Sequence, residues 1–201
     1  MLKTIIAIFT LALVCVSCSK GSVAGGPRST VSQTPSSTVP ASQPAAGEVS
    51  YKVPEGWKVE KPTSEMRLAQ YKLPKVEGDG EDGLLVLYYF GPGQGGTPQA
   101  NIDRWVSQVT QPDGSKSTEK AKTETMTVNG LQVTTVDVRG NYSGGMSQDS
   151  APKDNNSIYR LRGAIIETPK GSYFAKLTGP EKTVNHWQQA FDDYIKSFEF
   201  K

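Results

Sequence analysis

The chain carries few of the residue types that perform catalysis or bind transition metals. Both cysteines, Cys15 and Cys18, lie near its N-terminus, so the remainder has no disulfide, thiolate metal site or cysteine nucleophile. The one histidine, His186, cannot build a histidine-rich metal site. As a general base it would need a partnered nucleophile, and no serine stands in a Gly-x-Ser-x-Gly context. We therefore interpret His186 as a surface residue and predict no catalytic residue, no metal and no cofactor.

Two acidic groups are candidates for binding a cation or cleaving a glycosidic bond. Asp192 and Asp193 are adjacent in a predicted helix, where neighbouring side chains point in different directions. The segment Glu77–Asp82 mixes acidic residues with glycines but lacks the spacing of an EF-hand loop. It indicates a solvated hairpin tip, with weak binding of a divalent cation as the alternative.

A glycine-rich segment, Gly91–Gly96, stands between a predicted strand and a predicted helix, as phosphate-binding loops do. No Gly-Lys-Ser/Thr follows it and the helix does not begin directly after it, so a turned connection is favoured over a nucleotide loop. On the helix, Asn101 is interpreted as the N-cap and Trp105 as part of the core. Arg104 lies off the apolar stripe, and we hypothesise that it locks the glycine loop; the alternative is a solvated arginine. Asn101, Arg104 and Trp105 are the candidate binding residues.

The first residues are typical of an export signal. A basic start at Lys3 precedes the apolar run Thr4–Val14, which is shorter than the roughly 20 residues that cross a bilayer. The run ends at Cys15-Val16-Ser17-Cys18, which resembles the lipobox of bacterial lipoproteins, although Cys15 stands where leucine is usual. The resemblance implies that residues 1–17 are a signal peptide and that Cys18 is lipidated after cleavage. Ordinary secretory cleavage after Ala24 is the competing interpretation.

Lipidation would fix the protein to a membrane surface, because two or more acyl chains such as palmitate anchor a protein stably. Ser19, after the cysteine, resembles the sorting preference of outer-membrane lipoproteins, so the predicted location is the outer membrane facing the periplasm. Residues 18–49, rich in Ser, Thr, Pro and Gly, predict a disordered linker. From Ser50 onward basic and acidic residues are equal in number, which gives no reason to expect a nucleic-acid partner.

Residues 50–201 predict a single domain of strands and two helices. Hairpin turns are indicated at Asn129-Gly130 and at Pro169-Lys170-Gly171, and Ser143–Asn156 predicts a long mobile loop. The strands are predicted at Met66–Leu73, Leu84–Phe90, Thr123–Val128, Leu131–Arg139, Tyr159–Thr168, Ser172–Thr178 and Ser197–Phe200, and the helices at Asn101–Val109 and Pro180–Lys196.

The order of these elements resembles the PsbP-type α/β/α sandwich. The resemblance rests on the turn Val53-Pro54-Glu55-Gly56-Trp57, an antiparallel sheet of hairpins, a mid-domain helix carrying tryptophan and a closing aromatic helix. It implies an α+β fold class, with a largely antiparallel sheet flanked by helices on both faces. Members of this group mostly act as assembly or binding modules, and the resemblance implies no shared catalytic residue.

Together these features predict a lipid-anchored cell-envelope lipoprotein whose domain is a non-enzymatic binding or assembly module for a protein or another envelope component. Two alternatives stay open. One is a small-ligand carrier with a pocket between sheet and helices. The other is an envelope enzyme with an unfamiliar site, in which Asp103, Arg104 and His186 would converge.

Overall fold

The computed structural model describes residues 49–144 and 158–201, which belong to one compact unit, Val39–Lys201. The predicted signal peptide, Cys18 and nearly all of the predicted linker lie outside the described residues. Most of the predicted loop Ser143–Asn156 lies outside them as well. No helix in the described ranges is long and apolar enough to cross a membrane.

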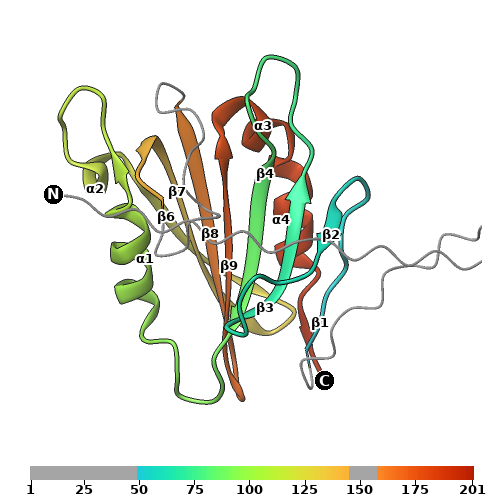
Figure 1. The fold of residues 1–201 in the computed structure, drawn as a ribbon. Coiled ribbons are helices and arrows are strands. Elements are labelled where there is room, and N and C mark those ends of the chain that lie inside the picture. The colour runs from blue at the N-terminus through green and yellow to red at the C-terminus, as the bar shows by residue number, and fades with distance from the viewer. Residues whose placement is uncertain (1–48, 145–157) are drawn as a thin grey trace, which may run out of the picture. The chain divides into compact units, whose positions relative to one another are not determined.

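The described residues form an antiparallel sheet and a separate pair of short strands (Figure 1). The sheet has the order β2-β3-β4-β9-β8-β7-β5, and β6 pairs with β7 outside this path. The separate pair joins β1 to β10, at the two ends of the described chain. The strands are β1 (Val49–Ser50), β2 (Lys58–Glu60), β3 (Arg67–Leu73), β4 (Gly83–Tyr89), β5 (Val109–Thr110), β6 (Lys122–Val128), β7 (Leu131–Tyr142), β8 (Tyr159–Thr168), β9 (Gly171–Pro180) and β10 (Glu199–Phe200).

The predicted hairpins are confirmed. Asn129 and Gly130 have φ angles of 47° and 82°, as the two central residues of a tight turn require, and Val128 faces Leu131 across it. The second hairpin pairs β8 with β9 through the predicted turn, and β9 runs further than predicted, to Pro180. The apolar strand β4 lies inside the sheet between β3 and β9, as its composition predicts.

The helices differ from prediction in their ends. Helix α1 (Pro98–Val106) is capped by Thr97, whose hydroxyl accepts the amide hydrogen of Ala100, so the prediction that Asn101 is the N-cap was wrong. The short helix α2 (Ser117–Lys120) lies outside the two predicted helices. The closing helix is divided at Trp187 into α3 (Glu181–His186) and α4 (Gln188–Lys196).

The two faces of the sheet carry separate apolar cores. Helices α3 and α4 cover one face, where Tyr194 and Phe198 pack on the strands, and α1 covers part of the other (Figure 1). Trp105 of α1 lies directly over Gly163 of β8, a position where a Cβ atom would be 2.4 Å from the indole ring. The predicted fold class is therefore confirmed: an α+β domain with a largely antiparallel sheet of hairpins flanked by helices.

Charged side chains join α3 and α4 to the sheet. Arg160 of β8 binds Asp137 of β7 through both carboxylate oxygens and also donates to Asn185 and Gln188. Arg162, two positions along the same strand, donates to Asp192 at 2.8 Å and lies over the ring of Phe191. We call these contacts the helix–sheet clamp; one of its carboxylates, Asp192, is a residue that the sequence offered as a candidate for chemistry.

Candidate functional site

Three cationic side chains meet on the face of the sheet that carries α1. Arg67 comes from the start of β3, Lys176 from the middle of β9, and Arg104 from α1. Their charges are close enough for Arg67 and Arg104 both to lower the pKa of Lys176. We call these three residues the cationic cluster.

Arg67 forms part of the floor of the cluster. Its side chain is buried, with 4% of the residue exposed, and its Nη1 donates to Oε1 of Gln70 at 2.6 Å. Its Nη2 is also buried and makes no hydrogen bond of good geometry with the residues that the structure describes, although the Arg67 side chain lies close enough to Tyr88 to interact with it. A buried guanidinium nitrogen without an acceptor is costly, since burial removes its water and returns no hydrogen bond.

Lys176 is the second floor residue. Its Nζ donates to Oε1 of Gln108 at 2.5 Å and to the hydroxyl of Tyr142 at 2.8 Å, both of which are neutral acceptors. Burial, together with the positive charges of Arg104 and Arg67, lowers the pKa of Lys176 to about 7. Lys176 therefore changes its charge near neutral pH.

Arg104 stands at the exposed rim, next to the glycine loop. Its Nη2 donates to Oδ1 of Asn101 at 2.5 Å, and Nδ2 of Asn101 donates to the carbonyl oxygens of Gly95 and Thr97. Asn101 is 1% exposed, so it is the residue that holds the glycine loop directly. The hypothesis that Arg104 locks this loop stays a prediction: Arg104 contacts the Asn101 amide, and Asn101 in turn contacts the loop.

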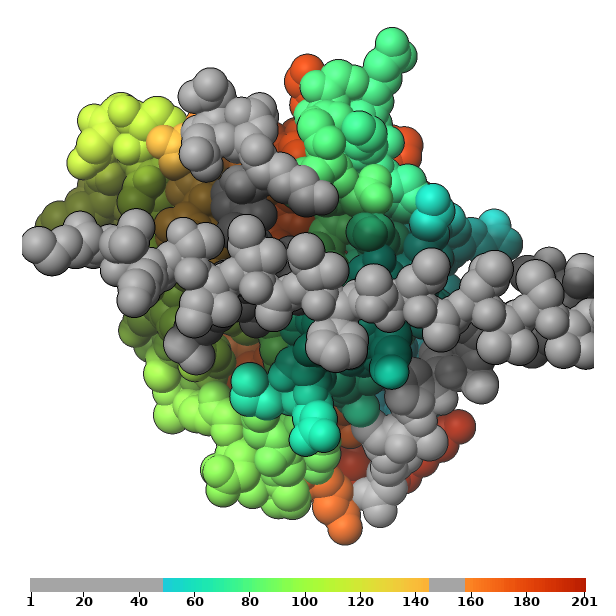
Figure 2. Space-filling view, viewed as in Figure 1, coloured from blue at the N-terminus to red at the C-terminus, as the bar shows by residue number. Residues whose placement is uncertain are grey.

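The glycine loop serves as a packing element at one end of the sheet. A Cβ on Gly95 would be 2.6 Å from the ring of Phe174, and one on Gly171 would be 2.7 Å from the carbonyl oxygen of Gly91. The loop and the β8–β9 turn lie side by side at the bottom of Figure 2. This close approach explains the glycines and agrees with the turned connection that the sequence favoured.

The cationic cluster has no matching negative charge among the described side chains. Arg67, Arg104 and Lys176 take part in none of the ion pairs found among the described residues. A carboxylate linked to the cluster is Glu60, which accepts from Gln70 at 3.0 Å and pairs with Lys72 at 2.8 Å. The bond to Lys72 lowers the pKa of Glu60, so this carboxylate already has its own cation.

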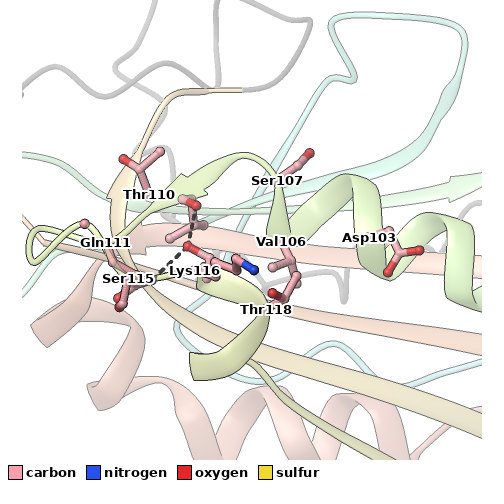
Figure 3. Close-up of a pocket in the computed structure, with 11 residues that line it drawn as sticks. Asp103, Val106, Ser107, Thr110, Gln111, Ser115, Lys116 and Thr118 are labelled. Atoms are coloured by element: carbon pink, nitrogen blue, oxygen red, sulfur yellow. Dashed lines mark hydrogen bonds between the residues drawn. The ribbon is translucent and has the colours of Figure 1, made fainter.

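A separate pocket of about 620 Å³ opens between α1, β5 and α2 (Figure 3). Its lining is rich in hydroxyl groups: Ser107, Thr110, Ser115, Ser117 and Thr118. Gln111 and Ser117 fix one wall, since Nε2 of Gln111 donates to Oγ of Ser117, which donates to the carbonyl of Val109. Asp103 and Lys116 also line it, but neither belongs to the cationic cluster.

The structure separates the residues proposed for an envelope enzyme. Asp103 faces the pocket, Arg104 joins the cationic cluster, and His186 is an exposed residue of α3 on the opposite face of the sheet. These three residues therefore do not converge. Trp105 is 3% exposed and packs in the core, as its position in the apolar stripe predicts.

The acidic segment Glu77–Asp82 makes more hydrogen bonds with the rest of the domain than the solvated hairpin tip that the sequence indicated. Oδ2 of Asp79 accepts hydrogen bonds from the amide and hydroxyl of Thr183 in the first turn of α3. Asp82 accepts the amide hydrogen of Lys75 across the loop. Within the described ranges, no group of three or more His, Cys, Asp or Glu side chains is placed to hold a metal ion.

Sequence reasoning missed Arg67 and Lys176. The available signal was a lysine in the middle of the apolar strand Tyr173–Leu177 and an arginine at the start of another. Long cationic side chains at such positions usually extend to solvent, so position alone does not reveal burial. Only the antiparallel order β3-β4-β9, which joins segments distant in sequence, brings the two together.

Neither a protein-family model nor a curated protein matches the chain, whereas solved structures do. LpqN, a protein involved in cell envelope biogenesis of Mycobacterium tuberculosis, aligns with a TM-score of 0.50 and 10% sequence identity, over 76% of this chain and 83% of that one. PsbP from the cyanobacterium Synechocystis aligns with a TM-score of 0.45 and 15% identity, over 77% of this chain and 87% of that one. The likeness to LpqN shows a common fold.

Proposed function

We propose that this protein is a lipid-anchored envelope lipoprotein whose domain binds another envelope component without catalysing a reaction. One observation carries the binding role: three cationic side chains meet on one face of the sheet, and a buried guanidinium nitrogen among them makes no hydrogen bond of good geometry with the described residues. Groups arranged in this way can hold a ligand, since charge-assisted hydrogen bonds are strong and directional. The envelope setting is supported by the lipobox-like sequence at Cys18 and by the fold shared with LpqN.

Crosslinking in intact cells, followed by purification of the protein, tests this proposal. The wild type should retain a specific partner or ligand after purification, and Arg104→Gln should lose most of it because the rim charge is removed. Arg139→Gln is the matched control, since Arg139 is an exposed arginine that pairs with Glu181 on the other face. Equal recovery from the wild type and Arg104→Gln would contradict a binding role for the cluster.

A small-ligand carrier is the second candidate function, because the pocket beside α1 offers a specific site for the ligand. Its volume of about 620 Å³ lies in the range of small-molecule sites, roughly 300–1,000 Å³. Filling it with Ser107→Trp should abolish retention of a co-purified small molecule and leave crosslinking at the cationic cluster intact. Loss of ligand through Arg104→Gln instead would assign the ligand to the cluster.

A further inference from the structure

Within the described residues, the side chains of the cationic cluster donate hydrogen bonds only to neutral acceptors. Gln70 accepts from Arg67, Asn101 accepts from Arg104, and Gln108 and Tyr142 accept from Lys176. Each acceptor offers a dipole and no charge, so no carboxylate bonded directly to these cations offsets their mutual repulsion. An anion bound among them would remove this repulsion.

The positions of the donors also indicate where such an anion would lie. Nη2 of Arg67 is the buried donor that makes no hydrogen bond of good geometry with the described residues, and Arg67 is paired across the strands with Tyr88. Tyr88 is half-buried, and burial raises its pKa, while the charge of Arg67, a side-chain hydrogen bond with Arg67 and the charge of Arg104 lower it. The positive charges of Arg67 and Arg104 therefore both act on the space beside Tyr88.

Access comes from the rim. Arg67 and Lys176 are buried, whereas Arg104 is exposed and Tyr88 and Gln108 are partly exposed. A ligand can therefore approach past exposed or half-exposed side chains and meet the buried donors behind them. This arrangement of a buried floor and an exposed, charged rim suits a small group with concentrated negative charge.

From this geometry we propose that the cationic cluster binds an oxyanion, a carboxylate or phosphate group, between Arg67, Lys176 and Arg104. Guanidinium groups match the oxygen spacing of both anions, and Lys176 adds a point charge. The inference rests on the proposed function, because it names the chemistry that the binding module recognises. The oxyanion can belong to a free ion or to an anionic lipid headgroup, and the two sources are separable by experiment.

Binding should strengthen as the pH falls through neutrality, because Lys176 gains its proton there. The groups that face Lys176 from the packed elements are Arg67 of β3, Tyr88 of β4, Arg104 and Gln108 at α1, Tyr142 of β7 and, along its own strand, Thr178. Both tyrosines keep their protons near neutral pH, since burial raises their pKa values. Lys176 is thus the group of this set whose charge changes in that range.

Calorimetric titration of the full lipid-anchored chain in an uncharged detergent tests the proposal. The titrants are inorganic phosphate, acetate and dihexanoylphosphatidylglycerol, each at a mildly acidic and a mildly alkaline pH. We expect saturable binding that falls about tenfold or more in Arg67→Gln and in Arg104→Gln, because each loses a charged hydrogen bond. Binding of acetate and of the lipid, whose charges do not change near neutral pH, should weaken at the alkaline pH. Arg139→Gln should bind like the wild type.

Each outcome of the titration bears on the proposal. Equal affinities for free phosphate and for the lipid identify a free ion as sufficient, whereas markedly tighter binding of the lipid identifies a headgroup, and both support the site. If Arg67→Gln does not fold, Arg104→Gln alone decides, since its guanidinium is exposed. Binding that is unchanged in Arg104→Gln, or no saturable binding of any titrant, would overturn the inference. In that case a partner captured in cells and lost with Arg104→Gln would still support the proposed function.

Discussion

Lys176 is held in surroundings that oppose its charge. Desolvation and two neighbouring cations favour its neutral form, while the Gln108 and Tyr142 acceptors favour its protonated form, and the net result is a pKa of about 7. A lysine with this pKa in the folded protein releases its proton several pH units below a lysine in the unfolded chain. Protein stability must therefore depend on pH through this residue.

The sign of that dependence is fixed by proton counting. Between about pH 7 and pH 9 the unfolded chain keeps Lys176 protonated while the folded chain loses the proton, so the unfolded state binds more protons and the free energy of unfolding rises with pH. We expect a rise on the order of 2 kcal/mol across this window. Chemical denaturation at several pH values should show it in the wild type and in the control Lys182→Met, an exposed lysine, and not in Lys176→Met. A wild type and Lys176→Met with the same pH slope would refute the assignment.

Gly163 lacks a side chain at a position where α1 packs closely on the sheet. An added methyl group would be 2.4–2.5 Å from the Trp105 ring and 3.0 Å from Val136. Gly163→Ala should therefore lower the free energy of unfolding by about 1–3 kcal/mol, the usual cost of overpacking a core. Gly80→Ala, with no atom within 4 Å of the new carbon, is the control and should change stability little. A neutral Gly163→Ala would show that α1 is not packed on β8 at this point.

Among the secondary-structure elements, the helix–sheet clamp shows how α3 and α4 are kept on the strands. The side chain of Arg160 is 7% exposed and bridges Asp137 on the sheet to Asn185 and Gln188 on the helices. Replacing it leaves the Asp137 carboxylate with the longer contact to Arg162 at 3.5 Å. Loss of a nearly buried charged partner is expensive, because the carboxylate is not fully rehydrated.

Arg160→Met should accordingly lower the free energy of unfolding by about 1–3 kcal/mol. The comparison is Arg139→Met, the adjacent cross-strand residue, whose pair with Glu181 is exposed and should contribute less than about 1 kcal/mol. Urea denaturation of both variants measures the difference. If both variants lose the same free energy, the clamp has no special role in holding the helices.

Most elements with strong periodicity were predictable, whereas most of the short ones were not; the short strand β10, predicted at Ser197–Phe200, is an exception. Strand β4 follows from its apolar composition. The hairpin turn follows from the pair Asn129-Gly130, two residue types that tolerate the positive φ angles found there. Helix α2 has no buried residue, and strand β5 has two residues, so neither produces a periodic pattern. At the break between α3 and α4, Nε1 of Trp187 donates to the carbonyl of Pro74, a tertiary contact. A sequence pattern cannot indicate a bond between segments so far apart.

For the whole molecule, the fold class could be predicted, whereas the candidate site could not. The alternation of hairpins and two aromatic or tryptophan-bearing helices was enough to predict an antiparallel sheet covered on both faces. The site depends on which strands become neighbours, and that order places Arg67 and Lys176 under Arg104. Of the three predicted binding residues, one joins the cluster, one orients the glycine loop and one packs in the core.

The lipid anchor remains a prediction from the sequence at Cys18. Cells grown with a radiolabelled fatty acid should label the wild type and fail to label Cys18→Ser, and the labelled protein should sediment with membranes. The physical reason is the hydrocarbon that the acyl chains bury, roughly 0.8 kcal/mol for each CH₂ group. Equal labelling of both proteins, or a mature wild-type chain that begins after Ala24, would contradict the anchor.

Site-directed photo-crosslinking in living cells tests the central claim most directly, namely that the envelope component binds at the cationic cluster. A photoreactive amino acid replaces Tyr88, beside Arg67, and in a second strain replaces Gln189, an exposed residue on the opposite face of the sheet. The account predicts a discrete crosslinked product from position 88 that disappears when Arg104→Gln is added, and none from position 189. A product from position 189 alone, or no product from position 88, would contradict it.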